Sequence, residues 1–184
     1  MVRKLKHHEQ KLLKKTSFFE WESDHGHQAE KIIKRYALKN RNEYVTYNKI
    51  SREAVTIAKK LRDLEPDDQF RIKATAQLLD KLYQCGFIKK TSNLEDVLRL
   101  SASKICQRRI PVVMVSMNMA QSVSVASNMV KEGHVRLGPE LISDPATLVT
   151  RKMEDFLTWR DTSKINVHRA NFHNVRDDFE MTNC

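Results

Sequence analysis

A chain of 184 residues fits one or two small domains, and its 40% hydrophobic and 30% charged residues indicate a small core under a heavily solvated surface. The net charge of +10 favours a polyanionic partner, because Lys and Arg neutralise phosphates and release their counterions. The sequence has no run of 18 apolar residues to span a membrane, and Cys85, Cys106 and Cys184 have neither disulfide-framework nor zinc-ligand spacing, which favours a reducing compartment.

The basic residues are concentrated towards the start of the chain. Residues 1–50 carry 12 basic and 6 acidic side chains, whereas residues 105–184 carry 10 and 9. Residues 1–15 predict either a short amphipathic helix or a basic arm that becomes ordered on a partner, with a frayed terminus as the plain alternative.

An aromatic cluster and two histidines follow. Phe18, Phe19 and Trp21 favour either stacking on bases or insertion into the protein's own core or a partner's groove. His25 and His27 have no nearby cysteines or carboxylates to complete a metal site, so we expect a loop there and no bound metal.

Helical spacing of apolar residues dominates the next part of the chain. It predicts helices over residues 28–40 and 42–64, and Glu65-Pro66 ends the second of these. Asp67 and Asp68 begin another helix, favoured by the positive end of the helix dipole, and Gly86 ends it. The buried stripe of that helix is expected to contain Phe70, Ala74, Leu78 and Leu82.

Two further helical turns precede the C-terminal third. The sequence Ser92-Asn93-Leu94-Glu95 matches a capping box and predicts a short helix from Asn93. Ser101 or Ser103 is expected to cap a turn that leads into Ile105.

The stretch from Arg108 to Gly138 predicts two short helices and a strand. Ser122 has the position and hydroxyl of an N-cap for the second helix, and Gly133 ends it. Residues 134–137 alternate polar and apolar side chains, as a half-buried strand does, and Gly138-Pro139 turns the chain. The helical spacing is carried by Ile110, Val113, Met114 and Met117 in the first helix and by Val125, Met129 and Val130 in the second.

After Pro145 we expect short strands around Leu148-Val149 and Phe156-Leu157, with Arg151-Lys152 at the turn between them. The polar sequence from residue 164 to 184 predicts an extended tail.

Residues 108–149 resemble the S4 RNA-binding domain of the ribosomal protein S4/S9 family. The resemblance is carried by Arg108-Arg109, Ala126, Met129-Val130, the run from Gly133 to Gly138, Pro145, Leu148 and Val149. The family commonly has Asn-Gly where this chain has Gly138-Pro139, so we expect a different hairpin turn.

The rest of the chain is similar to the nucleolar branch of this family, found in the U3 small nucleolar ribonucleoprotein. The similar segments are MVRKLKHHEQKLLKK, DQFRIKATAQLLDKLYQCGFI and VTRKMEDFLTW. This resemblance implies a non-catalytic RNA-binding protein of the small-subunit processome, located in the nucleus and nucleolus. It would bind the U3 small nucleolar RNA and precursor ribosomal RNA and promote their pairing, for maturation of small-subunit (18S) ribosomal RNA. The implied protein partners are the acidic processome scaffold phosphoprotein and other processome proteins.

The expected fold is α+β, with a mostly helical N-terminal region followed by a small S4 module of two short helices and short antiparallel strands. The predicted divisions are a basic helical region over residues 1–104, the S4 domain over 105–162 and a polar tail over 163–184. Phe18, Phe19 and Trp21, with Phe156 to Trp159, offer apolar anchors for a protein partner.

The S4 template implies an RNA-facing surface on the two short helices and the following strand. We expect the paired arginines to contact phosphates, and at least one guanidinium to reach solvent, unless one pairs with Glu154 or Asp155. The full predicted set is Arg108, Arg109, Gln121, Ser122, Lys131, His134, Arg136, Arg151 and Lys152.

No nucleophile–base motif or Gly-rich phosphate loop stands out in the sequence, so we expect no enzyme activity and no cofactor. Two alternatives remain open: a ribosomal protein of the mature small subunit, or a DNA-binding helix–turn–helix protein. The second helix offers no arginine to guanine edges, which favours RNA over DNA.

Overall fold

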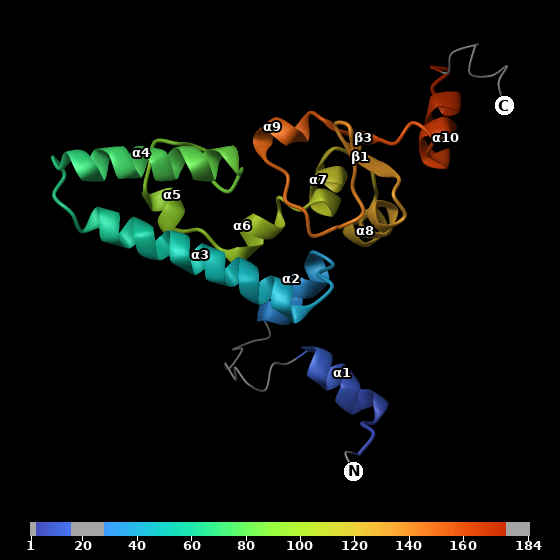
Figure 1. Cartoon of the computed structure of the whole chain (residues 1–184), viewed down its shortest axis with the longest axis horizontal. Helices are drawn as coiled ribbons and strands as arrows, with labels where there is room; N and C mark the ends of the chain where they lie inside the picture. The colour runs from blue at the N-terminus through green and yellow to red at the C-terminus, as the bar shows by residue number, and fades with distance from the viewer. Residues whose placement is uncertain (1–2, 16–27, 176–184) are drawn as a thin grey trace.

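The computed structural model describes residues 3–15 and 28–175. The aromatic cluster at Phe18, Phe19 and Trp21, and the histidines His25 and His27, therefore lie outside the described residues. The helices and strands are α1 (His7–Lys15), α2 (Gln28–Arg35), α3 (Arg41–Arg62), α4 (Gln69–Gln84), α5 (Glu95–Leu98), α6 (Ala102–Cys106), α7 (Ile110–Ser116), α8 (Val123–Lys131), β1 (Val135–Leu137), β2 (Glu140–Leu141), α9 (Arg151–Glu154), β3 (Leu157–Trp159) and α10 (Lys164–Phe172). This arrangement confirms the α+β fold (Figure 1).

Helices α3 and α4 lie side by side, with α5 packed against α3 (Figure 1). Helix α4 begins where the sequence predicts, because the side chain of Asp68 accepts a hydrogen bond from the Phe70 N–H at 2.9 Å. The predicted stripe is right in part: Leu78 and Leu82 are partly buried and pack against the core, and Leu79 is buried beside them. Phe70, by contrast, is 66% exposed. The prediction that Phe70 is buried is wrong, since this residue lies in the first turn of α4 and remains exposed. The core of this pair contains Ala58, Leu79, Ile88 and Val97.

The capping box does not form. Helix α5 begins at Glu95 with Leu94 in the N-cap position and without a side-chain cap hydrogen bond. Ser101 occupies the N-cap position of α6, also without such a bond. These helices of four and five residues are held by packing, since Val97, Ile105 and Cys106 are completely buried.

The S4 module has the predicted pair of helices and strand. The Ser122 hydroxyl accepts from the Val125 N–H at 3.3 Å, and Gly133 adopts a φ of +75° just beyond α8. Strand β1 is central in a three-stranded antiparallel sheet of order β2-β1-β3. The core between helices and sheet contains Ile110, Val113, Met114, Ala126, Val130, Val135, Val149, Leu157 and Trp159.

The hairpin turn between β1 and β2 differs from an Asn-Gly turn, as the sequence suggests. Leu137 pairs with Glu140, so Gly138 and Pro139 form a two-residue loop, and Gly138 has a φ of +60°. An Asn-Gly turn of type I′ needs positive φ at both positions, which the proline ring forbids. The loop therefore has the requirements of a type II′ turn.

Three predictions for the C-terminal part are wrong. Leu148 makes only an isolated β-bridge with Arg109, because the chain there passes the start of α7 and not another strand. Residues 151–154 form helix α9 and not a hairpin tip, and the strand lies at Leu157–Trp159. Part of the expected extended tail is helix α10, which begins because the Ser163 hydroxyl accepts from the Ile165 N–H at 3.3 Å.

The N-terminal region and the S4 module share a hydrophobic core. Tyr36 and Tyr47 from the helical region pack with Ile105 and Cys106, and Val112 and Leu148 of the S4 module pack against this cluster. The Tyr47 hydroxyl also lies 3.4 Å from the carbonyl oxygen of Ala146. Within the described ranges 3–15 and 28–175, no helix is both long and apolar enough to cross a bilayer.

Candidate nucleic-acid interface

Arg109 faces the interior of the protein. Its side chain is 2% exposed, and its Nη1 donates to Oε2 of Glu43 in α3 at 2.5 Å. Its guanidinium carbon also lies 5.9 Å from the centroid of the Tyr47 ring. The expectation that at least one of the two guanidiniums reaches solvent is not met by Arg109, because its side chain pairs inside the protein with a carboxylate from a helix distant in sequence.

Arg108 is also largely committed to contacts inside the protein. Its Nε donates to the carbonyl oxygen of Val149 at 2.9 Å, and both terminal nitrogens contact Oε2 of Glu154 at 3.1–3.2 Å. The side chain is 13% exposed. It crosses so close to Gly86 that a Cβ there would lie 2.7 Å from the arginine Nε. The alternative pairing with Glu154 is thus the arrangement found, and neither paired arginine extends freely into solvent.

Arg151 joins the S4 module to the helical region. Its Nε donates to the carbonyl oxygen of Tyr83, and its Nη2 to that of Ile88, both at 2.8 Å. Its guanidinium carbon lies 4.2 Å from the centroid of the Tyr83 ring. A planar guanidinium that donates to two carbonyls and stacks on an aromatic ring stabilises the packing of the two regions against each other. Lysine could not reproduce this geometry.

The exposed members of the predicted set lie on the S4 helices and on α9. Gln121 and Ser122 precede α8, Lys131 ends it, and Lys152 lies in the short helix α9; all four are exposed. Lys131 and Lys152 form no ion pair with another described residue. They are therefore the cations of the set most available to a ligand.

His134 and Arg136 make polar contacts along the central strand β1, which His134 precedes and Arg136 belongs to. His134 Nδ1 lies 3.0 Å from the Ser163 hydroxyl oxygen, and Nε2 lies 3.3 Å from Oε2 of Glu132. Arg136 donates to the Thr158 hydroxyl at 3.1 Å and to Asp161 at 2.7 Å, yet its side chain stays 38% exposed. An exposed ion pair of this kind contributes little stability, so a phosphate could replace the carboxylate.

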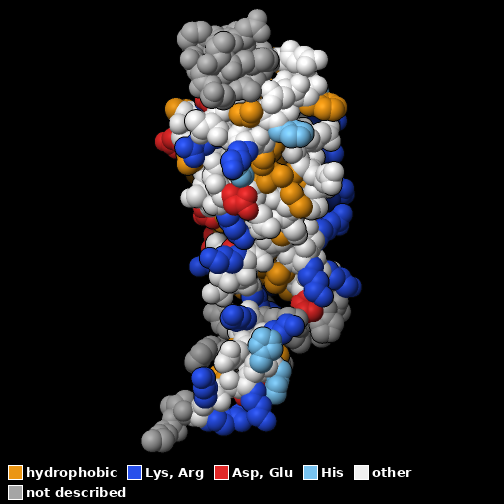
Figure 2. Space-filling model, turned by 90° about the vertical axis from the view of Figure 1, so that its right-hand side faces the viewer, with side chains coloured by type: hydrophobic (Ala, Val, Ile, Leu, Met, Phe, Trp, Pro, Cys, Tyr) orange, Lys and Arg blue, Asp and Glu red, His pale blue; other side chains and the backbone are white. Residues whose placement is uncertain are grey.

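The apolar anchors expected between Phe156 and Trp159 are divided by the strand. Leu157 and Trp159 are buried in the S4 core, whereas Phe156 is 61% exposed. An open groove of about 750 Å³ lies between the end of α7 and α10, where Met117, Ile165 and Phe172 meet the cations Lys164 and Arg169. Figure 2 shows the face at this end of the molecule, where Lys and Arg side chains border exposed hydrophobic ones. The sequence does not predict this groove, because the polar residues of α10 favour an extended tail over a helix.

The part of the chain that the structure describes forms no metal centre. No group of three His, Cys, Asp or Glu side chains within 3–15 and 28–175 is placed to hold a metal ion. Burial raises the pKa of the Cys106 thiol to about 11, so this cysteine is kept in its unreactive protonated form. Burial likewise raises the pKa of Tyr47, an effect that the nearby Arg109 charge partly offsets.

Two family models match consecutive parts of the chain. Residues 4–107 match the ribosomal protein S4/S9 N-terminal domain, and residues 108–155 match the S4 domain. The point where one model gives way to the other lies directly before the Arg108-Arg109 pair. It is also where the shared core joins the two regions.

Relatives match the chain almost from end to end. The U3 small nucleolar ribonucleoprotein protein IMP3 of Homo sapiens is 48% identical over 182 residues, which cover 98% of this chain and 99% of that protein. The protein of the same name from Saccharomyces cerevisiae is 46% identical over 183 residues, covering 99% and 100%. The small ribosomal subunit protein uS4 of Picrophilus torridus is 28% identical over 144 residues, covering 78% and 79%.

Proposed function

Because this chain belongs to the IMP3 family of S4-domain proteins, we propose that it is a non-catalytic RNA-binding protein of the U3 small nucleolar ribonucleoprotein. The observation that carries the proposal is the end-to-end similarity, 48% over 98% of the chain. The exposed cations Lys131 and Lys152 support it, since they lie on the S4 module and are not held in ion pairs with other described residues. The protein would act in ribosome biogenesis, in the nucleus and nucleolus.

The finer proposal is that the protein binds the U3 RNA and precursor ribosomal RNA and promotes their pairing. Two polyanionic strands pair faster when a basic surface offsets their repulsion, and salt weakens this effect. The net charge of +10 supports such a role. The revised RNA-contacting set consists of Gln121, Ser122, Lys131, His134, Arg136 and Lys152. Arg108, Arg109 and Arg151 support this surface through their contacts with glutamate carboxylates and backbone carbonyls inside the protein.

An annealing assay with U3 and precursor RNA segments tests the proposal. The protein should accelerate pairing at low salt, and the acceleration should fade as salt rises. The double variant Lys131→Ala/Lys152→Ala should reduce the slope of log affinity against log salt by up to about 2 units, because each phosphate contact contributes roughly 0.7–0.9. Lys73→Ala/Lys81→Ala on α4 is the matched control, since both lysines are exposed and lie outside the S4 module. No acceleration at low salt, or an equal change in both variants, would refute the assignment.

Two alternatives are separated by simple measurements. A ribosomal protein of the mature subunit would sediment with translating ribosomes, and the 28% identity to a uS4 protein is the observation in its favour. A processome protein would sediment only with large precursor particles. A DNA-binding protein would lose its RNA to duplex DNA in a competition assay.

We also propose that the protein binds the acidic scaffold phosphoprotein of the processome. The groove between α7 and α10 supports this, because Lys164 and Arg169 flank its apolar side chains, which suits an acidic segment with apolar anchors. The variant Lys164→Glu/Arg169→Glu should lose scaffold binding in a pulldown while its RNA affinity changes less. Scaffold binding that is retained in this variant would show that the groove is not the binding site.

A further inference from the structure

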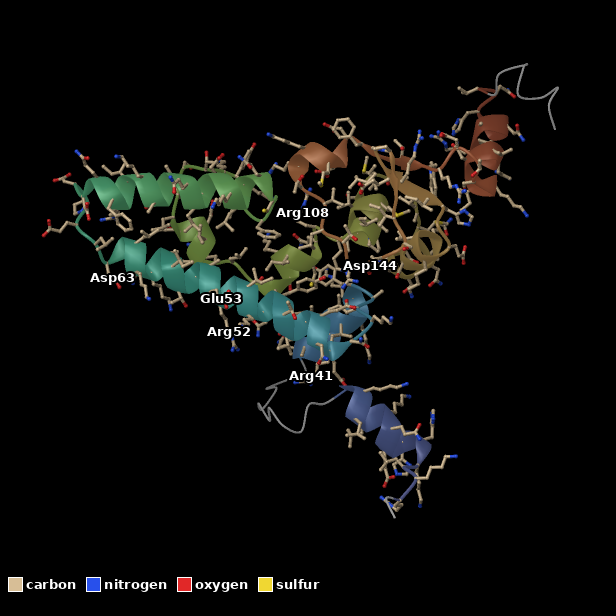
Figure 3. All side chains as sticks on the ribbon, viewed as in Figure 1. Arg41, Arg52, Glu53, Asp63, Arg108 and Asp144 are labelled. Carbon is tan, nitrogen blue, oxygen red and sulfur yellow. The ribbon has the colours of Figure 1, made fainter. Side chains whose placement is uncertain are left out.

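A small pocket lies at the boundary between the helical region and the S4 module. It has a volume of about 250 Å³, and Lys39 and Glu43 line it from the helical side. Arg109, Ser127 and Lys131 line it from the S4 side. Asp144, labelled in Figure 3, lies at this boundary too and also lines the pocket. The pocket thus brings together positive charges from two regions that are far apart in sequence.

Arg109 lines this pocket and carries a buried hydrogen-bond donor without a partner among the described residues. Glu43 contacts only Nη1, and Nε is buried without a hydrogen-bond partner among the described residues. The Nε–H and the neighbouring Nη2 of a guanidinium point in the same direction and form a two-donor edge that matches an oxyanion. A buried donor without a partner destabilises the folded protein, so an acceptor that reaches it from the pocket would stabilise the fold.

The surroundings favour an anion as that acceptor. Lys39 and Lys131 are exposed at the pocket, and Ser127 adds a hydroxyl that is almost fully buried. The acids present are Glu43, already neutralised by Arg109, and Asp144, which accepts from the Ala146 N–H at 2.9 Å. The first turn of the 22-residue helix α3 also adjoins the pocket, and its N-cap residue makes no side-chain hydrogen bond to the helix.

From this geometry we propose that the pocket binds one backbone phosphate of the RNA, held by Lys39, Lys131 and the free edge of Arg109. The proposal rests on the RNA-binding function proposed above and adds a contact that neither region could make alone. A phosphate held here would tie the RNA to the joint between the helical region and the S4 module. Arg109 thereby both braces the fold through Glu43 and receives the ligand through its other edge.

Inorganic phosphate tests the pocket without any RNA. Thermal unfolding of the full chain is measured while phosphate replaces chloride at constant ionic strength. A phosphate concentration about ten times the dissociation constant should raise the melting temperature by about 3–6 °C, because a ligand that binds the native state stabilises it by mass action. The Lys39→Ala/Lys131→Ala variant should lose this rise, and the Lys73→Ala/Lys81→Ala control should keep it. Phosphate also stabilises proteins in general by exclusion, and the rise that remains in the Lys39→Ala/Lys131→Ala variant measures that general contribution. An equal rise in both variants would overturn the proposal.

RNA binding by single variants completes the test. Lys39→Ala should weaken RNA binding and reduce the salt slope by about 0.7–0.9 units, the value of one phosphate contact. If phosphate binds the pocket but the RNA salt slope of Lys39→Ala equals that of the unaltered chain, the pocket holds an adventitious ion only and the proposal falls. If the unaltered chain does not bind RNA at all, the proposed function fails, while the phosphate experiment still reports on the pocket by itself.

Discussion

Replacing Glu43 by Gln should destabilise the whole protein, although Glu43 lies 66 residues from its partner Arg109 in sequence. Gln keeps the shape of the side chain and removes its charge, so the guanidinium is left buried at 2% exposure without a counterion. Breaking a buried ion pair in this way costs about 3–5 kcal/mol. Glu43 keeps 21% of its side-chain surface exposed, so water can offset part of the loss, and we expect the lower end, about 3 kcal/mol. For a chain of this length, that corresponds to a fall in melting temperature of roughly 6–12 °C.

Urea unfolding followed by circular dichroism measures this free energy directly. Glu95→Gln is the matched control, because Glu95 pairs with Arg99 at 3.8 Å on an exposed helix surface, with both side chains nearly 80% exposed. That change should cost less than about 0.5 kcal/mol. If Glu43→Gln is no more harmful than the control, the Arg109 charge is adequately solvated without Glu43, and the buried-pair reasoning is refuted.

Three further predictions concern local features. In chemical unfolding, Gly86→Ala should lower the free energy of unfolding by about 2–3 kcal/mol and Gly138→Ala by only about 1 kcal/mol. Both glycines have positive φ, but only at Gly86 would the new Cβ collide with Arg108. Equal losses would mean that Arg108 moves aside without cost. Ser122→Ala should lower the free energy of unfolding by about 1 kcal/mol, because it removes the hydrogen bond that caps α8. Ser101 begins α6 without such a bond, so Ser101→Ala should lower it by no more than about 0.5 kcal/mol. The reverse order would contradict the cap assignments. Mass spectrometry after brief alkylation at pH 8 should find Cys85 modified and Cys106 protected. Because the folded-state pKa of Cys106 is raised from 9.0 to about 11, its contribution to stability should be complete below pH 9 and lost as the pH rises towards 11, a loss that Cys106→Ala should remove.

Features set by local backbone chemistry could be predicted from the sequence. Asp68 and Ser122 cap helices because their oxygens reach N–H groups only two or three residues ahead. Gly86 and Gly133 end helices because each adopts positive φ just beyond the last turn. These signals involve neighbours in sequence, so they are visible without a fold.

The short helices were harder to predict, because a helix of four to nine residues depends on what it packs against. Helix α9 has the sequence RKME, without an apolar stripe, and it is held by the contacts of Arg151 with Tyr83 and Ile88. Helix α10 has apolar residues that do not gather on one face, so its sequence resembles a polar tail. Isolated segments of this length are marginal in water, and only their tertiary neighbours stabilise them.

The residues of the candidate site likewise fall into those whose exposure is set by local structure and those whose position is set by distant partners. The exposure of Lys131 and Lys152 follows from their own helices, whereas the fate of the three arginines is decided by partners far away in the chain. A positive charge at a helix start gains nothing from the dipole, which argued for a functional role of Arg108 and Arg109. The dipole of the local helix is only one of the influences on these two side chains. The carboxylates of Glu43 and Glu154 and the carbonyls of Tyr83, Ile88 and Val149 outweigh the dipole, because they act at hydrogen-bond distance inside the protein.

These contacts also bear on how the function can be dissected. Removing residues 1–104 to isolate the S4 module would take away Glu43 and leave the Arg109 charge unpaired. It would equally remove the carbonyls that hold Arg151 and the tyrosines that cover Ile105 and Cys106. Loss of RNA or partner binding in such a fragment would therefore report unfolding as readily as a lost contact. Point changes at exposed cations such as Lys39, Lys131 and Lys152 keep this joint intact, so differences among them can be assigned to the ligand.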